Sequence, residues 1–312
     1  MMRFLPVPLL MAAAVFTYFA FPYDLGFATR VVIIMLLVLS LDLILGVAGI
    51  VTLGQAAMYG MGAYAAGLYA VYVTAEPLSG LLLGCIAGAL IAWASGLMLM
   101  RAHGLTLIML TIALAQLLQE IANKASITGG ADGLRGIRMD PILGVFEFDF
   151  IGQTGFIFAS SVLILVVIFL IVLYGSPFGL MGRGINESPE RMRAIGAPVR
   201  QRLVIIYTIG GGIAGLAGAL SAQITELVSL EVFAFALSAE AVIMLILGGM
   251  GRIYGALLGT LIFMVVHHKA AAIDPFNWLF FIGVLLLGVV FFAPKGFFSM
   301  PTVLRRLLGG KP

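Results

Sequence analysis

The chain has 312 residues, of which 62% are hydrophobic and 10% are charged, and its formal net charge is +3. Its mean hydropathy of +1.17 excludes a water-soluble domain, because such domains are about half apolar and about a quarter charged. A positive charge also occurs in nucleic-acid-binding proteins. Here the basic residues are scattered between apolar runs, so we expect a membrane topology and no nucleic-acid partner.

Charge-free runs of about 20 residues or more recur along the chain, which is the length that an α-helix needs to cross the hydrocarbon of a bilayer. The runs have no period-two alternation, which argues against a barrel. We therefore predict an all-α polytopic transmembrane helical bundle, forming a single domain over residues 1–312 with about 8–10 membrane helices, some of them short, interrupted or re-entrant. The predicted helices lie near 4–22, 31–49, 52–74, 78–99, 104–122, 153–174, 203–222, 237–249, 254–267 and 276–293.

Two polar side chains interrupt the apolar sequence early in the chain. Asp42 stands within "VVIIMLLVLSLDLILGVAGI", where a charge costs roughly 2.5–3.5 kcal/mol, so it must face a cavity or a partner. Two interpretations stay open for Asp42, namely a polar wall of a solute path and an internally hydrogen-bonded clamp between helices. Gln55 follows the glycine-rich "GVAGIVTLGQ" and contacts either a polar solute or broken backbone.

Small residues recur every four positions and predict close contacts between helices, because they let two backbones approach in lipid. The rows are Gly80, Gly84, Gly88, Ala92 and Gly96, then Gly211 with Gly215, Ala214 with Gly218, and Gly251, Gly255 and Gly259.

The longest predicted outer loop is 123–150. Its Thr128 and Asp132, next to a cluster of glycines, either shape a solute entrance or make ordinary turns. Glu120 and Glu240 lie near predicted outer ends of helices, where we expect solvated termini.

A charged segment, 183–202, holds seven of the 31 charged residues of the chain. Ser188 and Pro189 favour a helix start, and Gly196 followed by Pro198 favours a stop. The segment is either a solvated loop or a short helix that docks on a soluble partner.

The glycine-rich "GGMGR", 248–252, predicts a break in the apolar segment 237–267, either as a simple turn or between re-entrant halves. With this break and a cytoplasmic N-terminus, both chain ends are cytoplasmic, with twelve basic residues inside and five outside.

Six segments, in this order, resemble the LivM-type permeases of branched-chain amino acid ABC importers across about residues 31–300. The segments are "LSLDLILGVAGIVTLGQAAMYGMGAYAAGLYA" (39–70), "TGGADGLRGI" (128–137), "SPFGLMGRGINESPERMRAIGAP" (176–198), "GLAGALSA" (215–222), "LSAEAVIMLILGGMGRIYGALLG" (237–259) and "FFAPKGF" (291–297).

The resemblance implies an importer in the bacterial inner membrane with a second, LivH-like permease, two ATP-binding subunits similar to LivG and LivF, and a periplasmic solute-binding protein. ATP and magnesium belong to the partner subunits, so no cofactor, metal or catalytic residue is expected on this chain. The coupling helix corresponds to about 184–198. The residues assigned to ATPase coupling are Glu187, Glu190, Arg191, Arg193, Ala194 and Gly196, and those assigned to the solute path are Asp42, Thr52, Gln55, Thr128 and Asp132.

Three positions depart from the pattern of these permeases. Arg193 replaces a usual Glu, Asp42 a common Asn, and Gln55 a common His. The solute class therefore stays open between branched-chain amino acids, urea, short amides and aromatic acids. The alternative function is an ion-coupled secondary transporter with Asp42 and Glu240 as ion sites.

Overall fold

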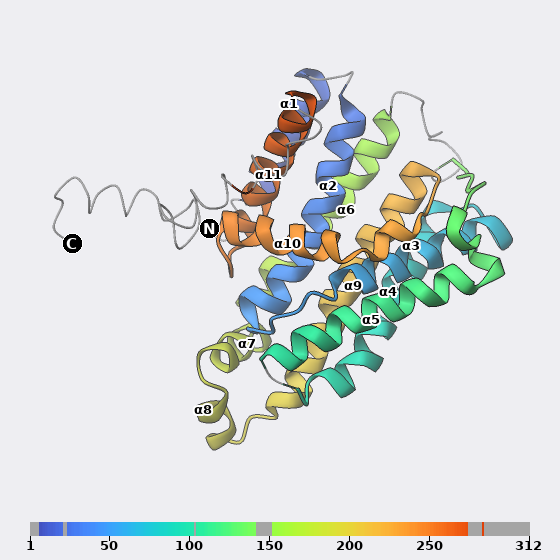
Figure 1. Cartoon of the computed structure of the whole chain (residues 1–312). Helices are drawn as coiled ribbons and strands as arrows, with labels where there is room; N and C mark the ends of the chain where they lie inside the picture. The colour runs from blue at the N-terminus through green and yellow to red at the C-terminus, as the bar shows by residue number, and fades with distance from the viewer. Residues whose placement is uncertain (1–5, 21–23, 103, 142–151, 274–282, 284–312) are drawn as a thin grey trace.

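The computed structural model describes residues 6–20, 24–102, 104–141, 152–273 and 283. Within these residues the chain is helical and forms no strand, which confirms the predicted all-α bundle (Figure 1). The α-helices are α1 (Pro6–Ala20), α2 (Leu25–Leu41), α3 (Gln55–Tyr72), α4 (Pro77–Leu99), α5 (Leu105–Lys124), α6 (Gln153–Gly175), α7 (Pro177–Glu187), α8 (Pro189–Ala194), α9 (Val199–Thr225), α10 (Phe235–Gly248) and α11 (Ile253–Ile273).

Six of the described helical segments are long and apolar enough to cross a bilayer, so the protein is a multi-pass membrane protein. Two further apolar segments are shorter, Leu10–Ala20 and Phe235–Gly248. The predicted span 276–293 lies outside the described residues. The six long segments are Leu25–Val47, Pro77–Leu99, Leu105–Lys124, Gln153–Gly175, Val199–Thr225 and Ile253–Ala272.

Several boundaries differ from the prediction. Helix α2 begins at Leu25, six residues before the predicted start, and it includes Arg30. The side chain of Arg30, in the second turn of α2, is exposed. Helix α9 begins at Val199 and likewise includes the charged residues that precede its apolar run. The segment before α8 is also helical, because α7 extends over Pro177–Glu187.

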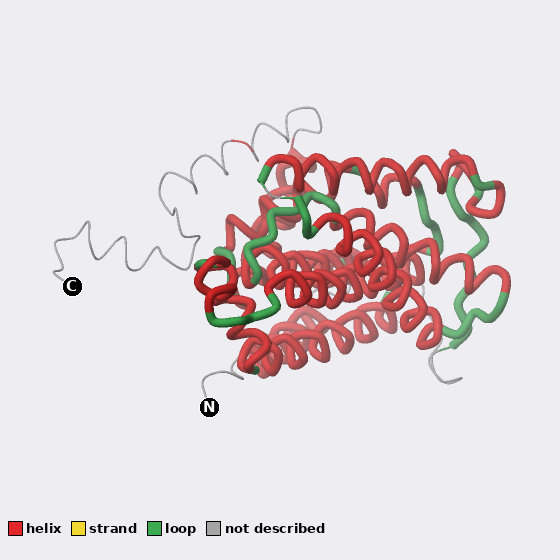
Figure 2. Tube along the Cα trace, turned by 90° about the horizontal axis from the view of Figure 1, so that it is seen from below, coloured by secondary structure: helices red, strands yellow, loops and turns green. Residues whose placement is uncertain are grey.

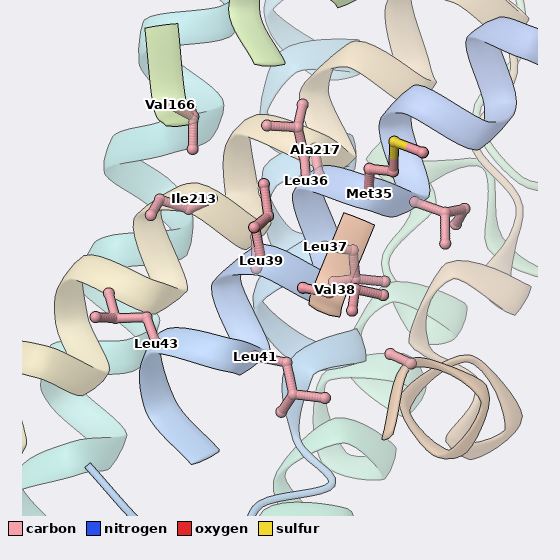
Figure 3. Close-up of a cluster of buried hydrophobic side chains, with 14 of the residues drawn as sticks. Met35, Leu36, Leu37, Val38, Leu39, Leu41, Leu43, Val166, Ile213 and Ala217 are labelled. Atoms are coloured by element: carbon pink, nitrogen blue, oxygen red, sulfur yellow. The ribbon is translucent and has the colours of Figure 1, made fainter. Parts of the chain in front are cut away.

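Helix α2 forms the centre of the bundle. Every residue from Val31 to Ile44 is buried, as expected for a helix that is apolar all round and surrounded by other helices. Figure 3 shows apolar side chains of α2 and of Leu43, in the π-helical segment that follows it, in one cluster with Val166 of α6 and Ile213 of α9. The loops between helices lie mostly at the two ends of the bundle (Figure 2).

Helices α3, α4 and α9 pack through the predicted small-residue rows. All five small residues of the α4 row are buried. A Cβ atom at Gly88 would lie only 2.8 Å from the Cα of Gly215 on α9, and a Cβ at Gly218 would collide with the Tyr59 carbonyl on α3. The rows on α4 and α9 are therefore confirmed as close helix contacts. In the third row, Gly255 and Gly259 of α11 lie against the backbone of α10, whereas Gly251 lies in the turn before α11.

We expect Gly88→Leu to destabilise the protein, because the larger side chain must push α4 away from α9. Overpacking of this kind costs about 1–3 kcal/mol, so the midpoint of thermal unfolding in detergent should fall by several degrees. Ala94→Leu on the exposed face of α4 is the matched control and should leave the midpoint unchanged. Equal stability of the two variants would contradict this account of the packing.

Candidate functional site

The chain is not helical between Val47 and Gln55. Helix α2 continues into a π-helical segment, Asp42–Val47, and α3 begins only at Gln55. Within residues 48–54, the N–H groups of Gly49 and Ile50 still donate to carbonyls of the preceding π-helical segment, at 3.2 and 3.1 Å. The N–H groups of Leu53 and Gly54 have no helical partner. Such groups must find other hydrogen-bond partners in a membrane protein, or line a water-filled cavity. We call residues 48–54 the helix break.

Buried hydroxyl groups from three parts of the chain satisfy the donors around the helix break. The Leu53 N–H donates to Thr111 Oγ1 on α5 at 3.2 Å, and the Gly54 N–H donates to Thr52 Oγ1 at 3.1 Å. The Ala56 N–H donates to Ser238 Oγ on α10 at 2.9 Å. The break is therefore held by α5 and α10 together.

The side chain of Gln55 lies in this polar cluster and is almost fully buried, with 1% exposure. Its Nε2 donates to Ser40 Oγ on α2 at 3.2 Å. Its Oε1 has no hydrogen-bond partner within the described part of the chain. The nitrogen of this amide therefore ties α3 to α2, while its buried oxygen keeps an unused capacity to accept a hydrogen bond.

Asp42 is also fully buried and joins three elements. Tyr174 Oη, at the end of α6, donates to Asp42 Oδ2 at 2.9 Å. The backbone N–H of Gly251, in the turn between α10 and α11, donates to Asp42 Oδ1 at 2.6 Å. Two donors to one carboxylate fit the interpretation of Asp42 as a clamp. Its place on the solute path stays a prediction.

Glycines make this close approach possible. The predicted break at 248–252 is confirmed, since α10 ends at Gly248 and α11 begins at Ile253. Gly251 has a φ of +77°, which favours glycine, and this conformation presents its N–H to Asp42. A Cβ atom at Gly46 would collide with the Asp42 carboxylate and with the Gly251 nitrogen.

The charged segment forms a helical elbow, α7 followed by α8, at one end of the bundle (Figure 1). Ser188 caps α8 by accepting the Arg191 N–H at 3.4 Å, and Pro189 is at the first turn. Gly196 ends the segment with a φ of +83°. The helix start and stop predicted from the sequence are thus confirmed. The residues assigned to coupling are all exposed: Glu187, Glu190, Arg191, Arg193, Ala194 and Gly196.

The elbow contacts the Asp42 clamp directly. Asn186 Nδ2, near the end of α7, donates to the Gly46 carbonyl at 3.4 Å. The guanidinium of Arg183 lies 5.7 Å from the ring centroid of Tyr174, whose hydroxyl holds Asp42. The elbow thus touches both the π-helical segment and the tyrosine that holds Asp42.

The predicted outer-loop residues lie apart from the helix break. Thr128 Oγ1 donates to the Ala125 carbonyl at 2.7 Å, just beyond the end of α5, while Asp132 is exposed. The loop is pinned by two backbone hydrogen bonds between Leu134 and Val228, of 2.8 and 3.1 Å. This is ordered turn structure, and the entrance role of Thr128 and Asp132 stays a prediction. The part of the loop from 142 to 150 lies outside the described residues.

The two other acidic residues have different surroundings. Glu120 forms an exposed ion pair with Lys124 at 3.1 Å, as expected for a solvated helix end. Glu240 is half-buried in the second turn of α10. It lies eight residues before Gly248, or about 12 Å along the helix axis from the end where the Gly251 turn meets Asp42. Asp42 and Glu240 therefore do not form one ion site.

Comparisons with known proteins agree with this arrangement. The family model described as "Branched-chain amino acid transport system / permease component" matches residues 24–290. The chain belongs to this permease family.

Its relatives in this permease family have low sequence identity to the chain, although one alignment covers nearly all of it. The "High-affinity branched-chain amino acid transport system permease protein LivM" of Escherichia coli (strain K12) is 25% identical over 97% of this chain and 76% of the relative. A probable LivM of Methanocaldococcus jannaschii is 28% identical over 53% of this chain and 52% of the relative, and a probable LivH of the same organism is 27% identical over 36% of each. No solved structure matches the chain.

Four residues that form hydrogen bonds at the helix break, at Gln55 and at Asp42 were not predicted from the sequence of this permease. Ser40, Thr111, Tyr174 and Ser238 supply hydroxyl groups to the helix break and to Asp42. A polar residue within an apolar run is a weak signal for each of them. Their partners are far away in the sequence, so no local pattern pairs them.

Removal of the Asp42 carboxylate should destabilise the protein. Asp42→Ala leaves the Gly251 N–H and the Tyr174 hydroxyl without their acceptor, at about 1–3 kcal/mol for each group. Asp42→Asn retains one carbonyl acceptor and should cost less. The measurement is thermal unfolding of the purified protein.

A double-mutant cycle with Tyr174→Phe separates the clamp from a path role. If the clamp exists, the double variant should lose less stability than the sum of the single variants, because the shared hydrogen bond is lost only once. Additive stability losses, together with altered solute uptake by Asp42→Ala at normal protein abundance, would favour the solute-path interpretation instead.

Proposed function

We propose that this chain is one of two permease subunits of an ABC importer that carries a branched-chain amino acid, or another small polar solute, across the bacterial inner membrane. The LivM relatives support the class of transporter, and the similarity to a LivH protein supports a pair of related permeases. The replacements at Asp42 and Gln55 keep urea, short amides and aromatic acids as further candidate solutes.

The proposal depends mainly on one observation, namely that the exposed elbow contacts the interior of the bundle. Its capped helices present a charged, exposed surface, and α7 contacts both the Gly46 carbonyl and the Tyr174 ring. A solvated connector has no need of this link to the interior. We place ATP and magnesium on two partner ATPase subunits that bind the elbow at residues 184–198.

The distribution of basic residues supports a cytoplasmic position for the elbow. Positive charges favour the cytoplasmic side of membrane proteins. By this rule, both chain ends and the elbow lie inside, and the loop at 125–141 faces a periplasmic solute-binding protein. The described basic residues on the elbow side are Arg101, Arg183, Arg191, Arg193, Arg200, Arg202 and Arg252.

The helix break is the proposed wall of the solute path. Irregular backbone at membrane depth often borders the substrate site of a transporter, and the open Oε1 of Gln55 is an acceptor for an ammonium or amide group. Thr52 and Asp42 shape this region through their own hydrogen bonds. Movement of the elbow would change the side of the membrane to which the break opens.

An ion-coupled secondary transporter is the rival function. It is less well supported, because the matching family model and the LivM relatives are permease components of amino acid transport systems. The rival is tested by gentle purification of the chain from its native membrane. We expect two ATPase subunits and a second permease to co-purify. Solute accumulation by the isolated chain, driven by an ion gradient, would overturn the importer proposal.

Gly196→Val should uncouple the transporter. Its φ of +83° strains any residue with a Cβ, and no atom lies near enough to clash, so the effect stays within the elbow. We expect solute-stimulated ATP hydrolysis of the complex to fall several-fold while membrane insertion is normal.

The matched control is Gly136→Val in the outer loop, which has a φ of +79° and equally open surroundings. It introduces the same backbone strain at the other side of the membrane. Normal coupling in the Gly196 variant, or equal loss in both variants, would argue against the assignment of the elbow.

Gln55→Leu should weaken solute uptake, because it removes the open amide oxygen at the break. The loss of one neutral hydrogen bond corresponds to roughly a fivefold rise in the half-saturating solute concentration. Gln223→Leu on α9 is the control, since Gln223 is another buried amide with a bonded nitrogen and an open oxygen, at the Pro77 end of α4. An equal rise in both variants would exclude a direct role for Gln55.

A further inference from the structure

A groove beside the elbow is not part of the helix break or of the Asp42 clamp. It has a volume of about 760 Å³ and lies between the C-terminal end of α4 and the start of α9, with α8 at its edge. Its walls are mainly apolar. The lining residues that matter here are Trp93, Leu97, Arg193, Arg200, Val204 and Ile205.

Two arginines give the groove a positive edge. Arg200 Nη2 donates to the Leu97 carbonyl at 2.7 Å, at the end of α4 where backbone carbonyls lack helical partners. This bond uses one of the five N–H groups of the guanidinium, and the others remain available to an anion. Arg193 faces the groove from α8. No acidic side chain lines the groove in the part of the chain that the structure describes.

The apolar walls of the groove belong to the lipid-facing surface. Trp93, Leu97 and Ile205 are 52%, 41% and 44% exposed, on two helices that are long and apolar enough to span the bilayer. Tryptophan is enriched at the boundary between hydrocarbon and headgroups. The groove therefore extends from the hydrocarbon to the level of the headgroups, and its arginines are at the polar end.

We propose that this groove binds an anionic phospholipid of the cytoplasmic leaflet, with the phosphate at Arg193 and Arg200 and an acyl chain along Trp93, Leu97 and Ile205. Basic pockets between membrane helices on the cytoplasmic side are suited to such headgroups. A free phosphate ester shares the headgroup chemistry but gains nothing from the apolar wall, so the lipid is the occupant.

Bound lipid would connect α8 to helices α4 and α9 of the bundle, which α8 otherwise contacts at few points. Arg193 belongs to α8, whereas Arg200 and the apolar wall belong to α9 and α4. A phosphate held by both arginines fixes the orientation of α8 relative to the bundle. Ala194 and Gly196 do not line the groove, so the tip of the elbow stays available to a soluble partner.

The test uses the complete transporter complex in nanodiscs that contain phosphatidylcholine and a trace of photoactivatable phosphatidylglycerol. We expect labelled peptides from residues 93–100 and 198–205, and competition by unlabelled phosphatidylglycerol but not by glycerol phosphate or phosphatidylcholine. Equal labelling by a phosphatidylcholine probe would overturn the proposal. Labelling that occurs only after removal of the ATPase subunits would also overturn it, because the groove would then be a protein interface.

The variant Arg193→Gln/Arg200→Gln should lose the preference for the anionic probe by roughly 25-fold, since each of the two cations near an anionic membrane surface contributes roughly fivefold. Arg135→Gln/Arg138→Gln removes the same charge from the outer loop and should keep the preference. An equal loss in both variants would contradict a local site. If the groove variant does not fold, competition by unlabelled phosphatidylglycerol in the unmodified complex still tests whether the groove binds the lipid. Neither measurement depends on transport or on the identity of the solute.

Discussion

Every backbone polar group within the membrane needs a hydrogen-bond partner, and this requirement organises the centre of the protein. The chain breaks its helix between Val47 and Gln55, and hydroxyl groups of Thr52, Thr111 and Ser238 then accept the N–H groups that the break exposes. Because two of these acceptors lie on α5 and α10, the break fixes the positions of both helices. The irregular segment is thus a junction of the bundle.

Close packing and polar contacts support each other around this junction. Small-residue rows on α4 and α9 bring these helices and α3 together, and glycines at 46 and 251 let the α10–α11 turn approach Asp42. Through Tyr174 and Asn186, the same cluster reaches the elbow. In the proposed coupling, force applied at α7 and α8 would act next to backbone that is already interrupted, where a change of conformation breaks few helical hydrogen bonds.

The sequence was sufficient for features that depend on local composition. Apolar length predicts the spans, four-residue spacing predicts the helix contacts, and Ser188, Pro189 and Gly196 predict the start and stop of α8. The partners of Asp42 and Gln55 were not predictable, because Tyr174 and Gly251 are 132 and 209 residues away from Asp42 in the chain. Helix α7 was missed because its glycines and charges resemble a loop. The roles of Thr52, Thr128 and Asp132 in solute transport remain predictions.

The π-helical segment Asp42–Val47 has a consequence for comparison among homologues. A π-helical turn holds one more residue than an α-helical turn, so it is equivalent to a single-residue insertion absorbed without a loop. Beyond such a turn, side chains are rotated by about 100° relative to a continuous α-helix. A homologue with an unbroken α-helix here would direct a different residue at the glycine turn, even with a similar apolar sequence. The register of this one turn thus determines which residue meets the turn between α10 and α11.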